Sequence, residues 1–157
     1  MDIQIIATQQ ITNNLDTTRE FGCFLLKANS IIRMLHWYTL NYNAHKILGN
    51  LYEDLDGLFD KLQEEIIGIC RLNNMTFPKI NPTTINLDLD NISQFRDENQ
   101  NTINLYYRVS SEITNTLTCL DFKNFTNQVK SGIDNTVDEI VTRLNKSNYL
   151  LSMVKFI

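Results

Sequence analysis

Residues that interrupt helices or bind phosphate are scarce in this chain. Its 157 residues include two prolines and five glycines, so long uninterrupted elements are expected. The glycines are isolated from one another, and they form no glycine-rich phosphate loop. The net charge is −4, and residues 1–18 contain no lysine or arginine, so a basic arm is missing. We therefore expect no nucleic-acid partner.

Long apolar runs and paired cysteines are missing as well. No apolar run approaches the roughly 18 residues that a membrane span needs, and residues 1–4 lack the positive flank of a signal peptide. Cys23, Cys70 and Cys119 form no CxxC pair. Three thiols without a secretion signal indicate a reducing compartment, in which free and mostly buried thiols are expected. We expect no membrane partner and an intracellular, cytoplasmic location.

The hydrophobic residues that are present follow a helical period. They make up 43% of the chain, which is ordinary for a globular protein of one domain. Apolar residues recur at i, i+3, i+4 and i+7 in four segments, and this predicts an all-α fold. We expect a single domain over residues 1–157 with helices at about 17–40, 43–72, 91–118 and 121–154.

Connections of different length predict how these helices are arranged. A capping box of Thr17 and Glu20 marks the start of the first helix, and residues 41–43 form a tight turn. Residues 74–90, with their two prolines, read as a long crossover or loop, and Asn91 or Ser93 as the next N-cap. Short, long and short connections predict a four-helix bundle with one long crossover between the second and third helices.

Four side chains are candidate metal ligands. The only two histidines, His36 and His45, flank the first turn and so lie at the same end of the bundle. Asp60 and Glu64 are four residues apart and share a helix face. Asp60 follows His45 by 15 residues, which is about 22 Å along a helix and too far for one ion. Either the two pairs serve different purposes, or a second copy brings its acids to the histidines in a two-fold dimer.

His36-Trp37, His45 and Asp60-x-x-x-Glu64 together resemble the Dps-type mini-ferritins of the ferritin-like superfamily. Residues 35–64 are still more similar to uncharacterised ferritin-like proteins of phages and large DNA viruses, and residues 138–151 are similar to their last helix. The likeness covers roughly a third of the chain. It implies a ferritin-like bundle and an intersubunit iron site made by the two histidines of one subunit and the two acids of the next. It also implies a homo-oligomer, with a two-fold dimer as minimum and a dodecamer as the Dps arrangement, and ferroxidase-type activity.

Two departures from the mini-ferritin pattern affect this site. Gly49 stands where these proteins carry an acid, and the interval between the histidines is three residues shorter. Four mixed nitrogen and oxygen ligands suffice for one Fe(II), Zn(II) or Mn(II), but a tight di-iron pair is disfavoured. The Glu-x-x-His signature of di-iron bundles is also absent, because Arg33 and Tyr42 precede the two histidines by three residues.

The candidate metal ligands also have simpler interpretations. His36 fits an interior histidine whose ring bonds a backbone carbonyl, with Trp37 as a packing anchor. The acids Asp60 and Glu64, like their neighbours Asp54, Asp56 and Glu65, fit the solvated face of an acidic helix. Two functions therefore remain open. One is a metal-binding protein that oxidises and sequesters iron, and the other is a non-catalytic structural or interaction protein, virus-encoded or part of a virion.

Overall fold

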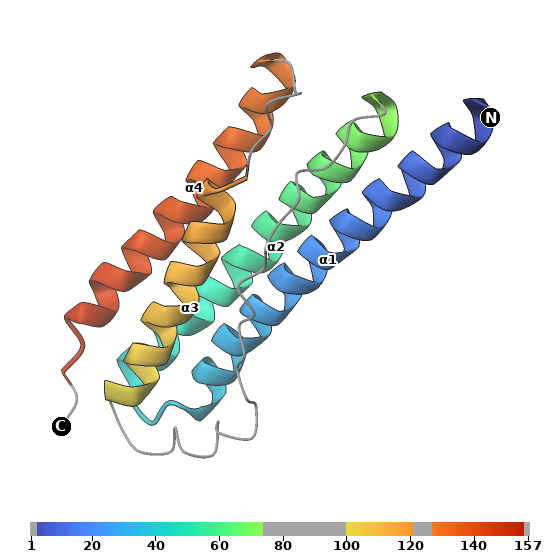
Figure 1. Ribbon diagram of the computed structural model, residues 1–157. Coiled ribbons are helices and arrows are strands. Elements are labelled where there is room, and N and C mark those ends of the chain that lie inside the picture. The colour runs from blue at the N-terminus through green and yellow to red at the C-terminus, as the bar shows by residue number, and fades with distance from the viewer. Residues whose placement is uncertain (1–2, 74–99, 121–126, 156–157) are drawn as a thin grey trace.

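The computed structural model describes the backbone of residues 3–73, 100–120 and 127–155, and the side chains of residues 18–72, 102–120 and 130–155. It contains four helices: α1 (Ile3–Tyr38), α2 (Tyr42–Asn73), α3 (Gln100–Thr118) and α4 (Asn127–Ser152). These described segments include no strand. The predicted all-α class with four helices is therefore confirmed (Figure 1).

Each helix packs mainly against two others. α1 contacts α2 and α3, and α4 contacts the same two helices, so α1 lies diagonally opposite α4. Figure 1 shows that α1 and α4 run in one direction and that α2 and α3 run in the other. α2 thus ends at the end of the bundle opposite to the start of α3. The expected crossover at 74–90 and the N-caps Asn91 and Ser93 lie outside the described residues.

The first helix starts earlier than the sequence suggested. α1 begins at Ile3, so the capping box of Thr17 and Glu20 lies within a continuous helix and does not start one. The prediction was wrong because a capping residue favours a helix start without stopping a helix that already runs through it. Residues 3–21 contain no glycine or proline that would interrupt the preceding turns.

A side-chain cap fixes the turn between α1 and α2. The amide oxygen of Asn41 accepts a hydrogen bond from the backbone N–H of Ala44 at 3.0 Å, which is the geometry of an N-cap. The carbonyl of Asn41 accepts a bond from the N–H of His45 at 2.9 Å, the first of the helical ladder. Asn41 also donates from Nδ2 to the carbonyl of Lys155 at 3.3 Å, so the same residue ties the turn to the chain after α4.

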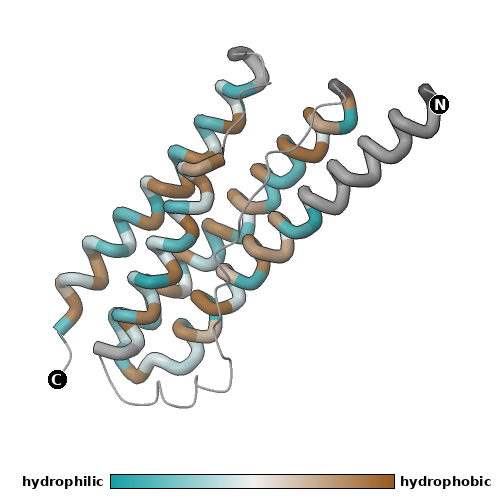
Figure 2. Tube along the Cα trace, viewed as in Figure 1, coloured by the Kyte–Doolittle hydropathy of each residue, from teal (hydrophilic) through white to brown (hydrophobic). Residues whose placement is uncertain are grey.

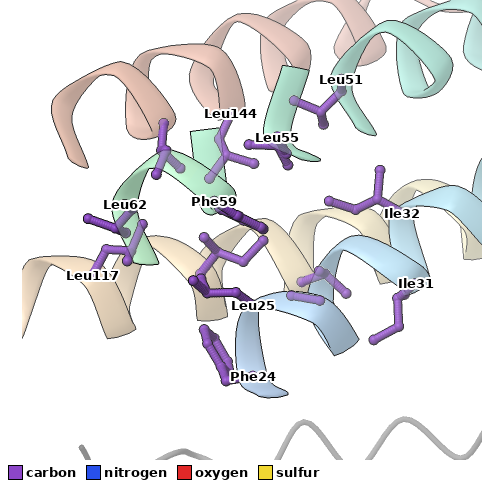
Figure 3. Packing of buried hydrophobic residues seen from close by; sticks show 14 of the residues in the cluster. Phe24, Leu25, Ile31, Ile32, Leu51, Leu55, Phe59, Leu62, Leu117 and Leu144 are labelled. Carbon is purple, nitrogen blue, oxygen red and sulfur yellow. The ribbon is translucent and has the colours of Figure 1, made fainter. Parts of the chain in front are cut away.

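The core follows the predicted apolar faces, and hydrophobic and polar residues alternate along each helix with the helical period (Figure 2). Figure 3 shows leucine, isoleucine and phenylalanine side chains of all four helices meeting in the bundle interior. One expectation was wrong. The thiols are not mostly buried, because Cys23 and Cys119 are exposed and Cys70 alone is buried. Among the residues that the structure describes, no helix is long and apolar enough to cross a bilayer.

Candidate functional site

The structure brings the two histidines together at the α1–α2 turn. His36 lies in the last turn of α1 and His45 in the first turn of α2. Nδ1 of His36 lies 2.7 Å from the carbonyl oxygen of His45, and Nδ1 of His45 lies 2.8 Å from the carbonyl oxygen of His36. The two residues therefore hydrogen-bond each other reciprocally, ring to backbone. The simpler interpretation of His36 as a carbonyl-bonded histidine is confirmed, and it holds for His45 too.

These contacts fix the tautomer of both rings. A carbonyl oxygen only accepts hydrogen bonds, so each Nδ1 must carry the hydrogen and donate it. In the neutral ring, Nε2 then keeps its lone pair. Histidines that bind metals nearly always donate their other ring N–H to a carbonyl or carboxylate in this way. Both rings therefore have the tautomer that a metal ligand needs, while the same hydrogen bonds join α1 to α2 as a histidine clasp.

The relative orientation of the rings limits how they could share an ion. The rings of His36 and His45 stack with centroids 3.9 Å apart and planes 21° from parallel. Lone pairs on ring nitrogens lie in the ring plane, so two nearly parallel planes do not direct both Nε2 atoms at a common point. The two rings can each offer one nitrogen, but binding of a single ion by both requires one ring to rotate.

Gly49 makes the observed position of His36 possible. A Cβ atom at Gly49 would lie 2.8 Å from Cε1 and 2.9 Å from Nδ1 of His36, closer than real contacts allow. The ring of His36 thus occupies the space that a side chain at position 49 would need. The sequence alone identified Gly49 as a missing acid, whereas the structure shows that its lack of a side chain admits the ring.

Aromatic and cationic groups surround the pair on the same side of α1 and α2. The ring of Tyr52 lies 5.2 Å from that of His36, and the guanidinium of Arg33 sits 4.8 Å above the Tyr52 ring. Trp37, expected to be a packing anchor, is instead 60% exposed, so that interpretation is wrong. Its exposure follows from the helical period. Trp37 comes two residues after Leu35, so it lies nearly on the opposite side of α1 from the face that Leu35 turns to the core.

Asp60 and Glu64 lie far from the histidines within one chain. Both are exposed, and α2 is a continuous helix that carries His45, Gly49 and both acids. The ring of His36 packs on Gly49, and Asp60 follows 11 residues later, which is about 16 Å along the helix. Within the described part of the chain, neither carboxylate forms an ion pair or a side-chain hydrogen bond. The structure of the single chain therefore joins the two histidines and leaves the two acids as a separate pair.

The acids near Asp60 and Glu64 are not all solvated alike. Asp54 forms an ion pair with Arg143 of α4. Glu65 is partly buried and accepts a hydrogen bond from the hydroxyl of the buried Thr136 at 3.0 Å. For Glu65 the expected solvated position is wrong, because its carboxylate packs against Thr136 of α4, whereas Asp54 stays exposed beside Arg143. Asp56 is exposed, as are Asp60 and Glu64.

A groove between α1 and α2 runs beside Asp60. Its volume is about 350 Å³, and Gly22, Gly57, Asn29, Asp60 and Gln63 contribute to its walls. Asn29 is 6% exposed and donates from Nδ2 to the carbonyl of Tyr52 at 3.2 Å, but its buried Oδ1 has no hydrogen-bond partner among the described residues. Gln63 donates to the carbonyl of Thr18 at 2.7 Å, and its buried Oε1 likewise has no partner there.

Such orphaned oxygens cost free energy, and because both are buried within the chain, a donor from outside reaches them only after the side chains move. Sequence reasoning missed both residues. The only available signal was a polar side chain at a position where the helical period predicts burial, as at Asn29, which follows the core residue Ala28.

The donors present fit a metal ion only in part. Two imidazole nitrogens of the correct tautomer and two exposed carboxylates are the ligand types that Fe(II), Zn(II) and Mn(II) accept. Among the residues that the structure describes, however, no cluster of three or more histidine, cysteine, aspartate or glutamate side chains could hold an ion. The described part of one chain therefore brings together no complete set of metal ligands, and a site that used all four residues would need a second copy.

Comparisons with known proteins add no relative to this picture. The chain matches no protein-family model, no curated protein and no solved structure.

Proposed function

We propose that this protein is a metal-binding protein of the ferritin-like superfamily, related to the Dps-type mini-ferritins. In this proposal His36 and His45 of one subunit and Asp60 and Glu64 of a second subunit hold one Fe(II) ion, with Zn(II) or Mn(II) as alternatives. The observation that carries it is the reciprocal bonding of the histidines, which leaves the lone pair of each Nε2 available. One ring would rotate out of the stack so that both nitrogens reach the same ion. The order and directions of the four helices agree with a ferritin-like bundle.

Features of the α1–α2 face support a dimer that would complete the site. Leu26 protrudes there with 68% of its surface exposed, while Gly22 and Gly57 line a hollow on the same face. A surface that combines a protruding leucine with a hollow can match its own copy across a two-fold axis. A dodecamer is the larger assembly that the Dps resemblance implies.

Iron would be both cargo and substrate at such a site. Each bound Fe(II) would lose one electron to dioxygen or hydrogen peroxide, and the Fe(III) product would be sequestered within the assembly. The absence of an acid at Gly49 leaves four ligands for one ion, which disfavours a tightly held iron pair. We place the protein in the cytoplasm of its host cell, where thiols such as Cys23 stay reduced.

Anaerobic titration with Fe(II) tests the proposal. The purified oligomer should bind about one ion per subunit saturably, and addition of dioxygen or peroxide should produce ferric absorbance. Asp60→Ala should abolish both without unfolding the helices, because Asp60 is exposed and forms no ion pair or side-chain hydrogen bond in the described part of the chain. Asp134→Ala is the matched control, since Asp134 is an exposed aspartate on α4. Equal binding by the wild type and Asp60→Ala would contradict the proposal.

The contact between His36 and Gly49 favours a second candidate. The ring of His36 fills the space beside Gly49 and joins α1 to α2 through its Nδ1 bond, a structural role that needs no metal. In this reading the protein is a non-catalytic structural or interaction protein, virus-encoded or a virion component, that keeps a ferritin-like scaffold. It predicts that Asp60→Ala changes assembly, measured by light scattering, and leaves metal behaviour as it is.

A further inference from the structure

A second recess lies between the start of α2 and the last turns of α4. Its volume is about 410 Å³, which falls within the range of small-molecule sites, roughly 300–1,000 Å³. Lys46 and Asn50 of α2 form one wall, and Arg143, Lys146 and Ser147 of α4 form the other. This recess, which we call the α2–α4 cleft, is distinct from the groove beside Asp60, because that groove lies between α1 and α2.

The walls of the α2–α4 cleft are positively charged, although the whole chain is acidic. Three cations line it and no acid does. Arg143 is paired with Asp54, so its charge is largely compensated. Lys46 and Lys146 are exposed, and neither forms an ion pair in the described part of the chain. Lys46 lies only above the ring of Tyr42, 5.5 Å from its centroid. Two uncompensated ammonium groups therefore remain at the mouth of the cleft.

One further donor lies in the wall of the cleft. The Nε atom of Arg143 is buried and has no hydrogen-bond partner in the part of the chain that is described, although its Nη2 bonds Asp54. A buried guanidinium N–H without an acceptor costs free energy, and an anion that enters the cleft and shifts this side chain would supply the acceptor. The helix dipoles add no net attraction, because the positive start of α2 and the negative end of α4 both border the cleft.

The kind of anion follows from which cations are free. A carboxylate is best recognised by the planar fork of an arginine, but the fork of Arg143 already serves Asp54. The remaining lysines are compact point charges, which suit the doubly charged and roughly spherical phosphate group. Beside them the cleft has an apolar side made by Ile47, Leu150 and Val154. A ligand with a phosphate and an apolar organic part would match both halves.

We propose that the α2–α4 cleft binds a small phosphate monoester, with the phosphate between Lys46 and Lys146 and the organic part against Leu150. This binding is independent of the metal site, which lies on other side chains. No sequence pattern indicates this cleft, because Lys46 and Lys146 are 100 residues apart and only the packing of α2 on α4 brings them to its walls.

Calorimetric titration with phenyl phosphate and with inorganic phosphate tests this inference on the full chain. Phenyl phosphate should bind saturably at one site per chain, and inorganic phosphate should bind more weakly at the same site. The double variant Lys46→Gln/Lys146→Gln should weaken both at least about tenfold. Lys61→Gln/Lys130→Gln is the matched control, because it removes the same charge from exposed lysines of the same two helices outside the cleft.

A third variant separates the two parts of the ligand. Leu150→Asn should weaken phenyl phosphate and leave inorganic phosphate unchanged, whereas the lysine variant affects both. Amide shifts in NMR spectra should change for residues 46–50 and 143–150. The inference is overturned if phenyl phosphate shows no saturable binding to the folded protein, or if the control variant loses as much affinity as the cleft variant.

Discussion

Replacement of Gly49 by alanine tests the arrangement of the histidine clasp, because two opposing effects act at this residue. Alanine in a helix interior is favoured over glycine by about 1 kcal/mol. The added Cβ, however, would lie 2.8 Å from Cε1 of His36, so the ring must rotate away. The ring then loses its hydrogen bond to the carbonyl of His45, worth about 0.5–1.5 kcal/mol, and its stacked contact, worth about as much again.

Whether Gly49→Ala raises or lowers the free energy of unfolding therefore depends on whether His36 is present. With His36 present, Gly49→Ala should lower the free energy of unfolding by up to about 2 kcal/mol, or leave it unchanged where the losses are smallest. In a His36→Ala background the clash is gone, and the same substitution should raise the free energy by about 1 kcal/mol. The coupling between the two positions is therefore about 1–3 kcal/mol.

Urea unfolding followed by circular dichroism measures both values, at one protein concentration because assembly would shift the midpoint. Gly68→Ala is the control, since a Cβ there would meet nothing within 4 Å and the position lies inside the same helix. It should stabilise by about 1 kcal/mol in both backgrounds. If Gly49→Ala stabilises the His36-containing protein as much as Gly68→Ala does, the described clasp is refuted.

Three further predictions concern the core. Burial raises the pKa of the Tyr106 hydroxyl, so the unfolded chain loses this proton at a lower pH than the folded chain does. The free energy of unfolding should therefore be constant below about pH 10 and fall above it. Chemical unfolding measures this fall, which should be shallower in Tyr106→Phe. Leu55→Ala, at a fully buried position, should cost about 2–5 kcal/mol in urea unfolding, against under about 0.5 for Leu72→Ala at a position 87% exposed. In the native protein a thiol reagent should modify two cysteines at once and Cys70 only as the chain unfolds, and three equally fast reactions would contradict its burial.

The helical faces could be predicted from sequence because burial in a bundle follows a local period. Residues such as Leu25, Leu55 and Ile113 lie where that period puts them, at under 3% exposure. The start of α1 could not be predicted in the same way, because Thr17 carries a capping signal that the uninterrupted helix overrides. The turn was easier, since Asn41 both caps α2 and stands in a cluster of polar residues.

Of the candidate site, the sequence predicts only that the two histidines lie near each other at the turn between α1 and α2. That His36 and His45 meet follows from a short turn between two helices, but their stacking and reciprocal bonds depend on side-chain rotation, which has no sequence period. The role of Gly49 depends on a contact between helices and appears only once they are packed. For the same reason the sequence alone predicts neither the ion pair of Arg143 with Asp54 nor the presence of Lys46 and Lys146 in one cleft.

Complementation between two variant subunits tests the intersubunit metal site most directly. One subunit carries His36→Gln and His45→Gln, and the other carries Asp60→Ala and Glu64→Ala. Neither should bind Fe(II) alone, whereas a refolded equal mixture should regain about one quarter of the wild-type capacity, since half of the dimers are mixed and each holds one intact site. A mixture that stays without Fe(II) binding while its subunits assemble would contradict the shared site, as would either variant binding Fe(II) by itself.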